Sequence, residues 1–394
     1  MPLLFIDGNS AAAYGAKLCR PGVVCAYPIT PQTPVVERLA EFIANGELDS
    51  IYIPAEGEHS AMAIVAAAAA TGVRTFTATS SQGLSYMQEC LFLAAGYRLP
   101  VVMAVANRSM GPPWTILAGH DDSVCQRDTG WIQAYCSRPQ EILDMVIQAY
   151  RIAEDRRVLL PIMVCYEGFA TSHLYEVVDV PDQGDVDSFL PPYEPPFKLD
   201  VEDPLIISTF VEADWWLGFK KLHDEAMERA KSVIAEVDAE FAKRFGRSYG
   251  GLLSTYRCDD ARVVVLTMGN LGLTARVAVD RLRERGVKVG LVRLRFLRPF
   301  PREALVEALE DVGSVCVLER NCSPGGYGGA VFHELRSALY AAGAKPLVLD
   351  FIVGMGGRDV TVAEIEGMAM EAARALERGV AEREVTWVYG RRRA

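Results

Sequence analysis

The sequence lacks any C-x-x-C pair, although it contains nine cysteines among its 394 residues. The cysteines are odd in number and widely scattered, which argues against a disulfide framework and predicts reduced thiols in the cytoplasm. Zinc sites and iron–sulfur clusters need closely spaced cysteines. We therefore expect no metal site and no cluster bound by this chain alone.

A long hydrophobic run is also missing. The most apolar stretch extends from Ala61 to Val73 and is too short to cross a bilayer. The first residues, MPLLFIDGNS, have no basic segment and make a poor secretion signal. The formal net charge of −11 argues against nucleic acid or an anionic membrane as the main partner. The sequence predicts a cytoplasmic protein.

Two nucleotide-binding patterns are absent as well. Neither G-x-G-x-x-G nor G-x-x-x-x-G-K-[ST] occurs, which makes NAD(P) binding and nucleotide hydrolysis poor explanations. The glycine-rich stretch SPGGYGGAVFHEL, residues 323–335, has a different spacing. Two interpretations stay open for it: an anion-binding helix start, or a tight turn that lets a helix pack closely on a sheet.

Short β-rich runs do alternate with helical stretches between residues 23 and 165. Runs such as VVCAYPI, RTFTAT and LPVVMAVA are typical of buried strands, and helices are expected over 34–46, 58–71, 83–96 and 138–154. Because the strands are almost continuously apolar, they indicate a parallel sheet with helices on both faces.

A second unit of the same class follows a linker. Residues 181–214 are rich in proline and acids, and residues 215–246 have the apolar spacing of an amphipathic helix. From residue 261 strands and helices alternate again. We therefore expect two doubly wound α/β domains, 1–195 and 255–394, joined by a proline-rich linker and long helix, 196–254.

Polar residues gather where the strands of the first unit end. YPITPQT, PAEGEHS, TSSQG and ANRSMGPPW follow four successive predicted strands. The carboxyl ends of parallel strands meet at one edge of a sheet, which is where ligands bind. The four segments together predict a functional site at that edge.

Taken singly, these polar residues carry weaker signals. His59 stands at a helix start, where a histidine is more often structural than catalytic. The run GHDDSVCQRDTGW, residues 119–131, favours a salt-bridged loop over a metal site. Arg108 directly follows a strand, where it is either a solvated end or a ligand for a carboxylate through two parallel hydrogen bonds.

In order, the motifs YPITPQT, EGEHSAMA, ATSSQGL, ANRS and HDDSVCQRDTGWIQ closely resemble those of the α subunit of 2-oxoacid:ferredoxin oxidoreductases. The second unit adds RLRFLRPFP and ERNCSPGGYGGAVFHELRSAL, so the match covers nearly the whole chain. The resemblance implies a thiamine diphosphate enzyme that decarboxylates a 2-oxoacid oxidatively and passes electrons to ferredoxin. It also implies a pyrimidine-binding domain over 1–195 and a domain similar to the C-terminal domain of transketolase over 255–394.

The resemblance further implies that the site is shared between chains. In this family a G-D-G motif holds the diphosphate and Mg²⁺, and this sequence has none. The implied β subunit therefore binds Mg²⁺ and the diphosphate, and partner subunits (β, with γ and δ or their equivalents) carry the [4Fe–4S] clusters. Coenzyme A is the implied co-substrate, the implied assembly is a dimer of hetero-oligomers, and the chain alone is expected to be inactive.

Residue roles come from the same resemblance. The family's catalytic glutamate stands fourteen residues before the glycine that ends a small-residue helix, and counting back from Gly72 selects Glu58 over Glu56. Its carboxylate would bind N1′ of the pyrimidine, while Thr30 and Arg108 match residues that hold the substrate. The other implied positions line the cofactor or form a substrate loop: Pro28, Ile29, Ser81, Gln82 and Gly83 for the cofactor, and Gly111, Pro112, Pro113, His120, Asp121 and Asp122 for the loop.

The substrate is less sharply specified. Pyruvate is expected first and branched-chain 2-oxoacids next, although YPITPQT is shared by both kinds of enzyme and does not choose between them. The segment ILAG departs from the pyruvate enzymes, and the neutral SMGPPW does not favour an oxalate enzyme. Two other classes stay open: a thiamine-dependent dehydrogenase or transketolase that uses no ferredoxin, and a non-catalytic scaffold.

Overall fold

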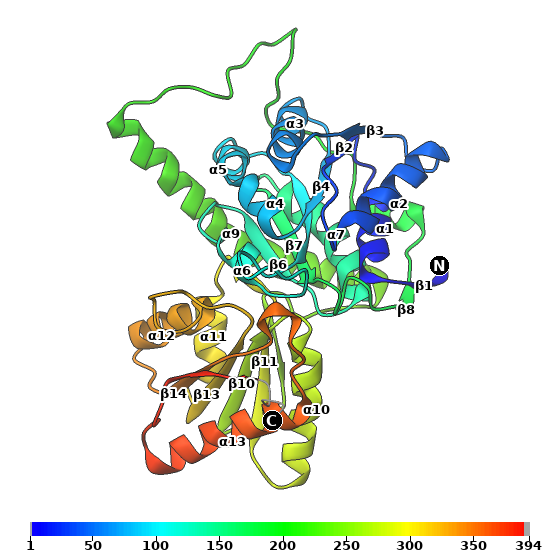
Figure 1. Cartoon of the computed structure of the whole chain (residues 1–394). Coiled ribbons are helices and arrows are strands. Elements are labelled where there is room, and N and C mark those ends of the chain that lie inside the picture. Colours follow the sequence, from blue (N-terminus) through cyan, green and yellow to red (C-terminus); the bar gives the residue numbers. More distant parts are fainter. Residues whose placement is uncertain (1, 390–394) are drawn as a thin grey trace.

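The structure is a computed structural model that describes residues 2–389, and it consists of two α/β units stacked end to end (Figure 1). The first, coloured blue to green, contains a seven-stranded sheet, and the second, coloured yellow to red, a six-stranded sheet. A two-stranded antiparallel ribbon of β1 (Leu3–Ile6) and β8 (Glu176–Asp179) lies at the margin of the first unit. The predicted α/β class is confirmed.

The first sheet has the strand order β12-β6-β7-β5-β4-β2-β3. All neighbours are parallel except β12, which runs antiparallel to β6. The central strands β4, β5 and β7 are buried along their whole length, as helices on both faces require. The strands are β2 (Val23–Ala26), β3 (Ile51–Pro54), β4 (Thr75–Thr79), β5 (Val102–Asn107), β6 (Ile132–Tyr135), β7 (Ile162–Glu167) and β12 (Phe296–Arg298).

Two groups of helices cover this sheet. One hydrophobic core contains α1 (Gly8–Leu18), α2 (Thr33–Ala44), α7 (Pro139–Ala153) and α8 (Gln183–Phe189). The other contains α3 (Glu58–Ala70), α4 (Ser81–Tyr86) and α5 (Gln88–Gly96), and a short α6 (Asp121–Val124) precedes β6. Alanine, the best helix former, dominates α3, and its small side chains let this helix lie close to the sheet.

The second sheet has the order β15-β14-β13-β10-β11-β9, in which only β9 is antiparallel to its neighbour. One face is covered by α10 and α13, and the other, with α11 and α12, shares a core with the first unit. Its elements are β9 (Leu253–Tyr256), β10 (Val263–Met268), α10 (Leu271–Glu284), β11 (Val289–Leu294), α11 (Arg302–Leu309), β13 (Ser314–Glu319), α12 (Ala330–Ala342), β14 (Leu347–Ile352), a 3₁₀ turn (Met355–Gly357), α13 (Val362–Arg378) and β15 (Val385–Trp387).

A 33-residue helix, α9 (Ala213–Phe245), connects the two units. Its second half buries Val233, Ile234 and Phe241 in the core of the first unit. Its first half projects from the body together with the extended chain before it (Figure 1). We call residues 199–222 the arm, and several of its apolar side chains are exposed, namely Leu199, Val201, Leu205, Ile206, Phe210, Trp215, Trp216, Leu217, Phe219 and Leu222.

Candidate active site

The predicted site residues of the first unit come together at one edge of its sheet. Strands β5, β4, β2 and β3 are consecutive neighbours. The segments after their carboxyl ends carry Arg108, Ser81, Thr30 and Glu58, respectively. Parallel strand order therefore brings four distant segments to one place.

Glu58 is the first residue of α3 and is 8% exposed. Its carboxylate faces the start of α4, where a Cβ added to Gly83 would lie only 2.5 Å from Glu58 Oε1. Position 83 must therefore be glycine for the carboxylate to keep this place. Across residues 2–389 the Glu58 carboxylate has no hydrogen-bond partner, so both oxygens are available to a ligand.

The polar neighbours of Glu58, namely Glu56 and His59, instead contact side chains of nearby residues. Glu56 is exposed and accepts a hydrogen bond from Ser60 Oγ, which lowers the pKa of the Glu56 carboxyl. His59 Nε2 lies 3.3 Å from a carboxylate oxygen of Glu89 and 3.6 Å from Cys90 Sγ. These contacts match the structural interpretation of Glu56 and His59.

The turn that opens α4 is strained and firmly held. Ser81 has φ of 51°, a left-handed conformation that is costly for a residue other than glycine. Its N–H donates to Asp122 Oδ2 at 2.9 Å, and its hydroxyl donates to the carbonyl of Ser109 at 3.0 Å. The next residue, Gln82, has a buried Nε2 without a hydrogen-bond partner in the described part of the chain.

Thr30 and Arg108 are in direct contact although 78 residues separate them. Arg108 Nη1 donates to the carbonyl of Thr30 at 3.0 Å, and Arg108 Nε donates to the carbonyl of Thr115 at 3.0 Å. Pro28 is exposed on the same segment, and Ile29 is half-buried with its N–H 3.3 Å from Gln32 Oε1. The guanidinium is therefore fixed between the YPITPQT segment and the predicted substrate loop.

The predicted substrate loop, residues 111–122, is part of a slightly longer loop, residues 109–122, which has an exposed tip and a buried base. Gly111 has φ of 76° with open space around its Cα, and both Pro112 and Pro113 are exposed. At the base His120 and Asp122 are 1% and 0% exposed. The loop residues named from the sequence thus fall into two sets. Gly111, Pro112 and Pro113 lie at the tip, and His120, the half-buried Asp121 and Asp122 lie at the base.

Asp122 joins the pieces of the site. Its Oδ2 accepts the N–H groups of Ser81 and Arg108, each at 2.9 Å, and its Oδ1 accepts Asn107 Nδ2 at 2.7 Å. Burial raises the pKa of the Asp122 carboxyl to about 6, against the opposing effect of these hydrogen bonds. One buried carboxylate therefore holds the turn at Ser81 and the segment that carries Arg108 together.

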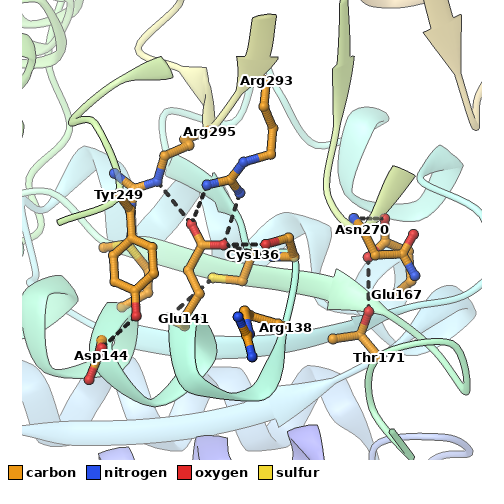
Figure 2. A network of polar contacts seen from close by, with 12 residues as sticks. Cys136, Arg138, Glu141, Asp144, Glu167, Thr171, Tyr249, Asn270, Arg293 and Arg295 are labelled. Atoms are coloured by element: carbon orange, nitrogen blue, oxygen red, sulfur yellow. Dashed lines mark hydrogen bonds and ion pairs between the residues drawn. The ribbon is translucent and has the colours of Figure 1, made fainter. Parts of the chain in front are cut away.

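Other residues that contact the loop were not predicted. His120 Nε2 lies 3.1 Å from Oε1 of Glu167. The same oxygen accepts the N–H of Asn270 at 2.9 Å (Figure 2). The backbone N–H of His120 donates to the backbone carbonyl of Arg320 at 2.9 Å. Glu167 ends a buried strand, so the strand-end rule that selected the other segments also marks it; no local pattern marks Arg320.

The surroundings of Glu58 fit an aminopyrimidine ring. An unpartnered carboxylate can accept an N–H, the buried Gln82 amide can donate, and the missing Cβ of Gly83 leaves the carboxylate room. Within residues 2–389 no group of three or more His, Cys, Asp or Glu side chains is placed to hold a metal ion. In the same range no helix is long and apolar enough to cross a membrane.

Comparison with known families gives a consistent match. The family described as "Pyruvate flavodoxin/ferredoxin oxidoreductase, thiamine diP-bdg" matches residues 14–239, and "Pyruvate:ferredoxin oxidoreductase core domain II" matches residues 261–365. The chain is 47% identical to the pyruvate synthase subunit PorA of Pyrococcus horikoshii and 46% identical to its ketoisovalerate oxidoreductase subunit VorA. Each alignment covers 98% of both chains.

Solved structures show the same fold. A 2-oxoglutarate:ferredoxin oxidoreductase from Magnetococcus marinus superimposes with a TM-score of 0.73 at 18% identity, over 94% of this chain and 65% of that one. A split-gene transketolase gives a TM-score of 0.55 at 14% identity, over 94% and 99% of the two chains.

The family match over residues 14–239 thus defines a protein with a thiamine-diphosphate-binding domain. More specifically, the chain belongs to the 2-oxoacid:ferredoxin oxidoreductases, as an α subunit of these multi-subunit enzymes. The family predicted from the sequence motifs is confirmed.

Proposed function

We propose that this chain forms the pyrimidine-binding half of an enzyme that converts pyruvate, coenzyme A and oxidised ferredoxin into acetyl-CoA, CO₂ and reduced ferredoxin. The buried Glu58 carboxylate, without a protein partner and set against Gly83, is the observation that carries the proposal. Bound thiamine diphosphate would supply the nucleophilic carbon and the electron sink for decarboxylation.

Each predicted residue then has a physical task. Glu58 holds a proton at N1′ of the pyrimidine, and low exposure to water makes that charge-assisted hydrogen bond strong. Gln82 would donate a hydrogen bond to the cofactor near the pyrimidine ring, and Pro28 and Ile29 would line the cofactor site. Arg108 and Thr30 hold the 2-oxoacid carboxylate and carbonyl, because a guanidinium is the best bidentate partner for a carboxylate.

The remaining parts of the enzyme are proposed to lie on other chains. A β subunit would bind the diphosphate and Mg²⁺, and partner subunits (β, with γ and δ or their equivalents) would carry the [4Fe–4S] clusters. Residues 1–195 would act as the pyrimidine-binding domain and 255–394 as the transketolase-like domain, joined by 196–254. The assembly would be a dimer of hetero-oligomers in the cytoplasm, in keeping with nine free cysteines.

A second candidate substrate is 2-oxoisovalerate. Relatives named for ketoisovalerate match this chain as well as those named for pyruvate, at 46% and 47% identity. Steady-state rates with pyruvate, 2-oxoisovalerate, oxalate and phenylglyoxylate, measured with one electron acceptor, will rank them. If kcat/KM is highest for 2-oxoisovalerate, this acid replaces pyruvate as the proposed substrate, and the proposed type of reaction stays the same.

The assignment of Glu58 predicts a sharp difference between two neighbouring acids. In the assembled complex, Glu58→Gln should lower kcat for 2-oxoacid-dependent ferredoxin reduction by about 10²–10⁴-fold, because the amide cannot hold the N1′ proton as a carboxylate does. Glu56→Gln, at an exposed side chain bonded to Ser60, should remain within about threefold of wild type. Assembly, measured by size-exclusion chromatography, should be unchanged in both.

Near-normal turnover of Glu58→Gln would refute the assigned role. The wider classes are separated by the purified native complex, which should be brown and contain iron. A colourless complex would indicate a thiamine enzyme that uses no ferredoxin. A complex that assembles but binds no thiamine diphosphate would indicate a scaffold.

A further inference from the structure

A glycine-rich turn of the second unit packs against the loop that frames the substrate position. We call residues 354–357, between β14 and α13, the glycine turn. Gly354, Gly356 and Gly357 all have positive φ, at 65°, 66° and 72°, which residues with side chains rarely adopt. The sequence GMGG therefore builds a tight projection that other residues would not form.

The glycine turn contacts the base of the 109–122 loop through its own backbone. The Gly356 N–H donates to Ser109 Oγ at 3.0 Å, and the Gly357 N–H donates to the carbonyl of Ala118 at 2.7 Å. A Cβ added to Gly357 would lie 2.3 Å from Leu117 Cβ. The two segments are thus in contact without room for a single additional methyl group.

Arg320 holds the glycine turn and the loop at the same time. Its side chain is buried, and Nη1 donates to the carbonyl of Gly354 at 3.2 Å. Its own carbonyl accepts the His120 N–H at 2.9 Å. The second unit therefore supports both ends of the short segment from Leu117 to His120.

The supported segment leads directly to the substrate-binding arginine. The carbonyl of Leu117 accepts the Ser109 N–H at 3.0 Å, and the carbonyl of Thr115 accepts Arg108 Nε at 3.0 Å. The loop tip beyond it is exposed, with Trp114 69% accessible to water. The position of the tip and of the guanidinium therefore depends on the base that the glycine turn fixes.

We propose that the glycine turn fixes the shape of the 109–122 loop and so sets which 2-oxoacid side chain the site accepts. The proposal rests on the function proposed above. It makes Gly357 and Ser109 positioning residues, which act on substrate through Leu117, Thr115 and Arg108. Substrate choice would then be encoded partly in the second unit, outside the segments proposed above to bind the cofactor.

The test compares two alanine substitutions in the same turn, each made in the assembled complex. Gly357→Ala adds a methyl group against Leu117, whereas Gly356→Ala adds one where the nearest atom is Thr115 Cγ2 at 3.9 Å. Both carry the same strain, because both positions have φ near 70°. Any difference between them therefore reports the contact with the loop.

Gly357→Ala should raise KM for the 2-oxoacid and change the ratio of kcat/KM for pyruvate to that for 2-oxoisovalerate by about tenfold. KM for coenzyme A and for ferredoxin should not change. Gly356→Ala should keep the substrate ratio within about twofold of wild type. Amide hydrogen exchange should accelerate over residues 111–118 in Gly357→Ala alone.

An unchanged substrate ratio and unchanged exchange in Gly357→Ala would overturn the proposal, as would equal effects of the two alanines. If Gly357→Ala fails to assemble, Ser109→Ala decides, because it removes the hydroxyl that accepts the Gly356 N–H and donates to the Ala118 carbonyl; an unchanged substrate ratio in Ser109→Ala would overturn the proposal. Failure of the proposed function is separate: a wild-type complex that turns over no 2-oxoacid would refute that function before any variant is compared.

Discussion

At the scale of single residues, Asp122 is notable because its buried carboxylate accepts four hydrogen bonds. Oδ2 accepts two backbone N–H groups, and Oδ1 accepts Asn107 Nδ2 and the N–H of Ser123. An ionised carboxylate satisfies all four, and a carboxamide satisfies only two. The geometry therefore requires an acid at this position.

Asp122→Asn should lower the free energy of unfolding by about 1–3 kcal/mol and raise KM for the 2-oxoacid, because an amide nitrogen in place of Oδ2 cannot accept the backbone N–H groups of Ser81 and Arg108. Asp121→Asn is the matched control. Asp121 Oδ2 accepts only the Met110 N–H, and its Oδ1 has no hydrogen-bond partner among the described residues. Thermal unfolding and steady-state kinetics of both complexes check the prediction; equal losses would contradict it.

Sequence reasoning identified the residues proposed to bind ligand more readily than the contacts that hold these residues in place. Glu58, Thr30 and Arg108 were predicted because strand ends converge and because the motifs resemble a family, and the structure places all three at one edge; their catalytic roles stay predictions. The support given by Asp122, Glu167 and Arg320 depends on contacts between segments far apart in the chain. No local pattern contains that information.

At the scale of elements, α7 presents two buried acids, Glu141 to the second unit and Asp144 to the segment between α9 and β9. Glu141 accepts Arg293 Nη1 and Nη2, each at 2.9 Å, and Arg295 Nε at 3.0 Å (Figure 2). One turn later, Asp144 accepts Tyr249 OH at 2.6 Å and Arg247 Nε at 2.7 Å. Burial alone would raise the pKa of Glu141, but the two arginines lower it to about 2.

This shift predicts acid-dependent stability. The unfolded chain, with an ordinary glutamate pKa near 4.5, binds the proton more tightly than the folded chain, so stability falls as pH drops from about 4.5 toward 2. Above that window the shift contributes about 3 kcal/mol. Glu141→Gln should lose this contribution at pH 7 and flatten the pH dependence of the melting temperature between pH 4.5 and 3.

The matched control for this prediction is Glu176→Gln. Glu176 pairs with Arg138 beside the same helix, but half of the arginine side chain is exposed. Solvent-exposed pairs contribute at most about 1 kcal/mol, so Glu176→Gln should melt close to wild type at every pH. Equal destabilisation by the two substitutions would contradict the importance of burial.

Helices could be predicted from the sequence where one face of the helix is buried and the opposite face is exposed to water. The predicted helix 215–246 is α9, Ala213–Phe245, because its apolar positions recur at helical spacing. The helix α1 escaped prediction, since nine of its eleven residues are buried and it shows no polar face. The predicted helix 83–96 is divided at Met87 into α4 and α5.

At the scale of the whole molecule, the two units are interlocked. Strand β12 lies beyond residue 255 in the sequence but pairs with β6 at the edge of the first sheet. The glycine turn supports the substrate loop, and Arg293 and Arg295 are bonded to α7. The sequence was divided into two domains at residue 255, but in space a strand from beyond that residue belongs to the first sheet. Sequence patterns alone do not reveal this exchange.

The arm has an optical consequence. Trp215 and Trp216 are 70% and 55% exposed on it, whereas Trp131 is fully buried. The fluorescence of an indole ring in water lies at longer wavelength than that of an indole ring in apolar surroundings. Because large exposed apolar surfaces are typical of interaction sites, we expect the arm to be covered in the assembled enzyme. Tryptophan fluorescence should therefore shift to shorter wavelength when the chain joins its partner subunits, and the shift should be smaller in Trp215→Phe/Trp216→Phe, in which only Trp114 and Trp387 remain exposed. An identical spectrum before and after assembly would mean that the arm stays in water.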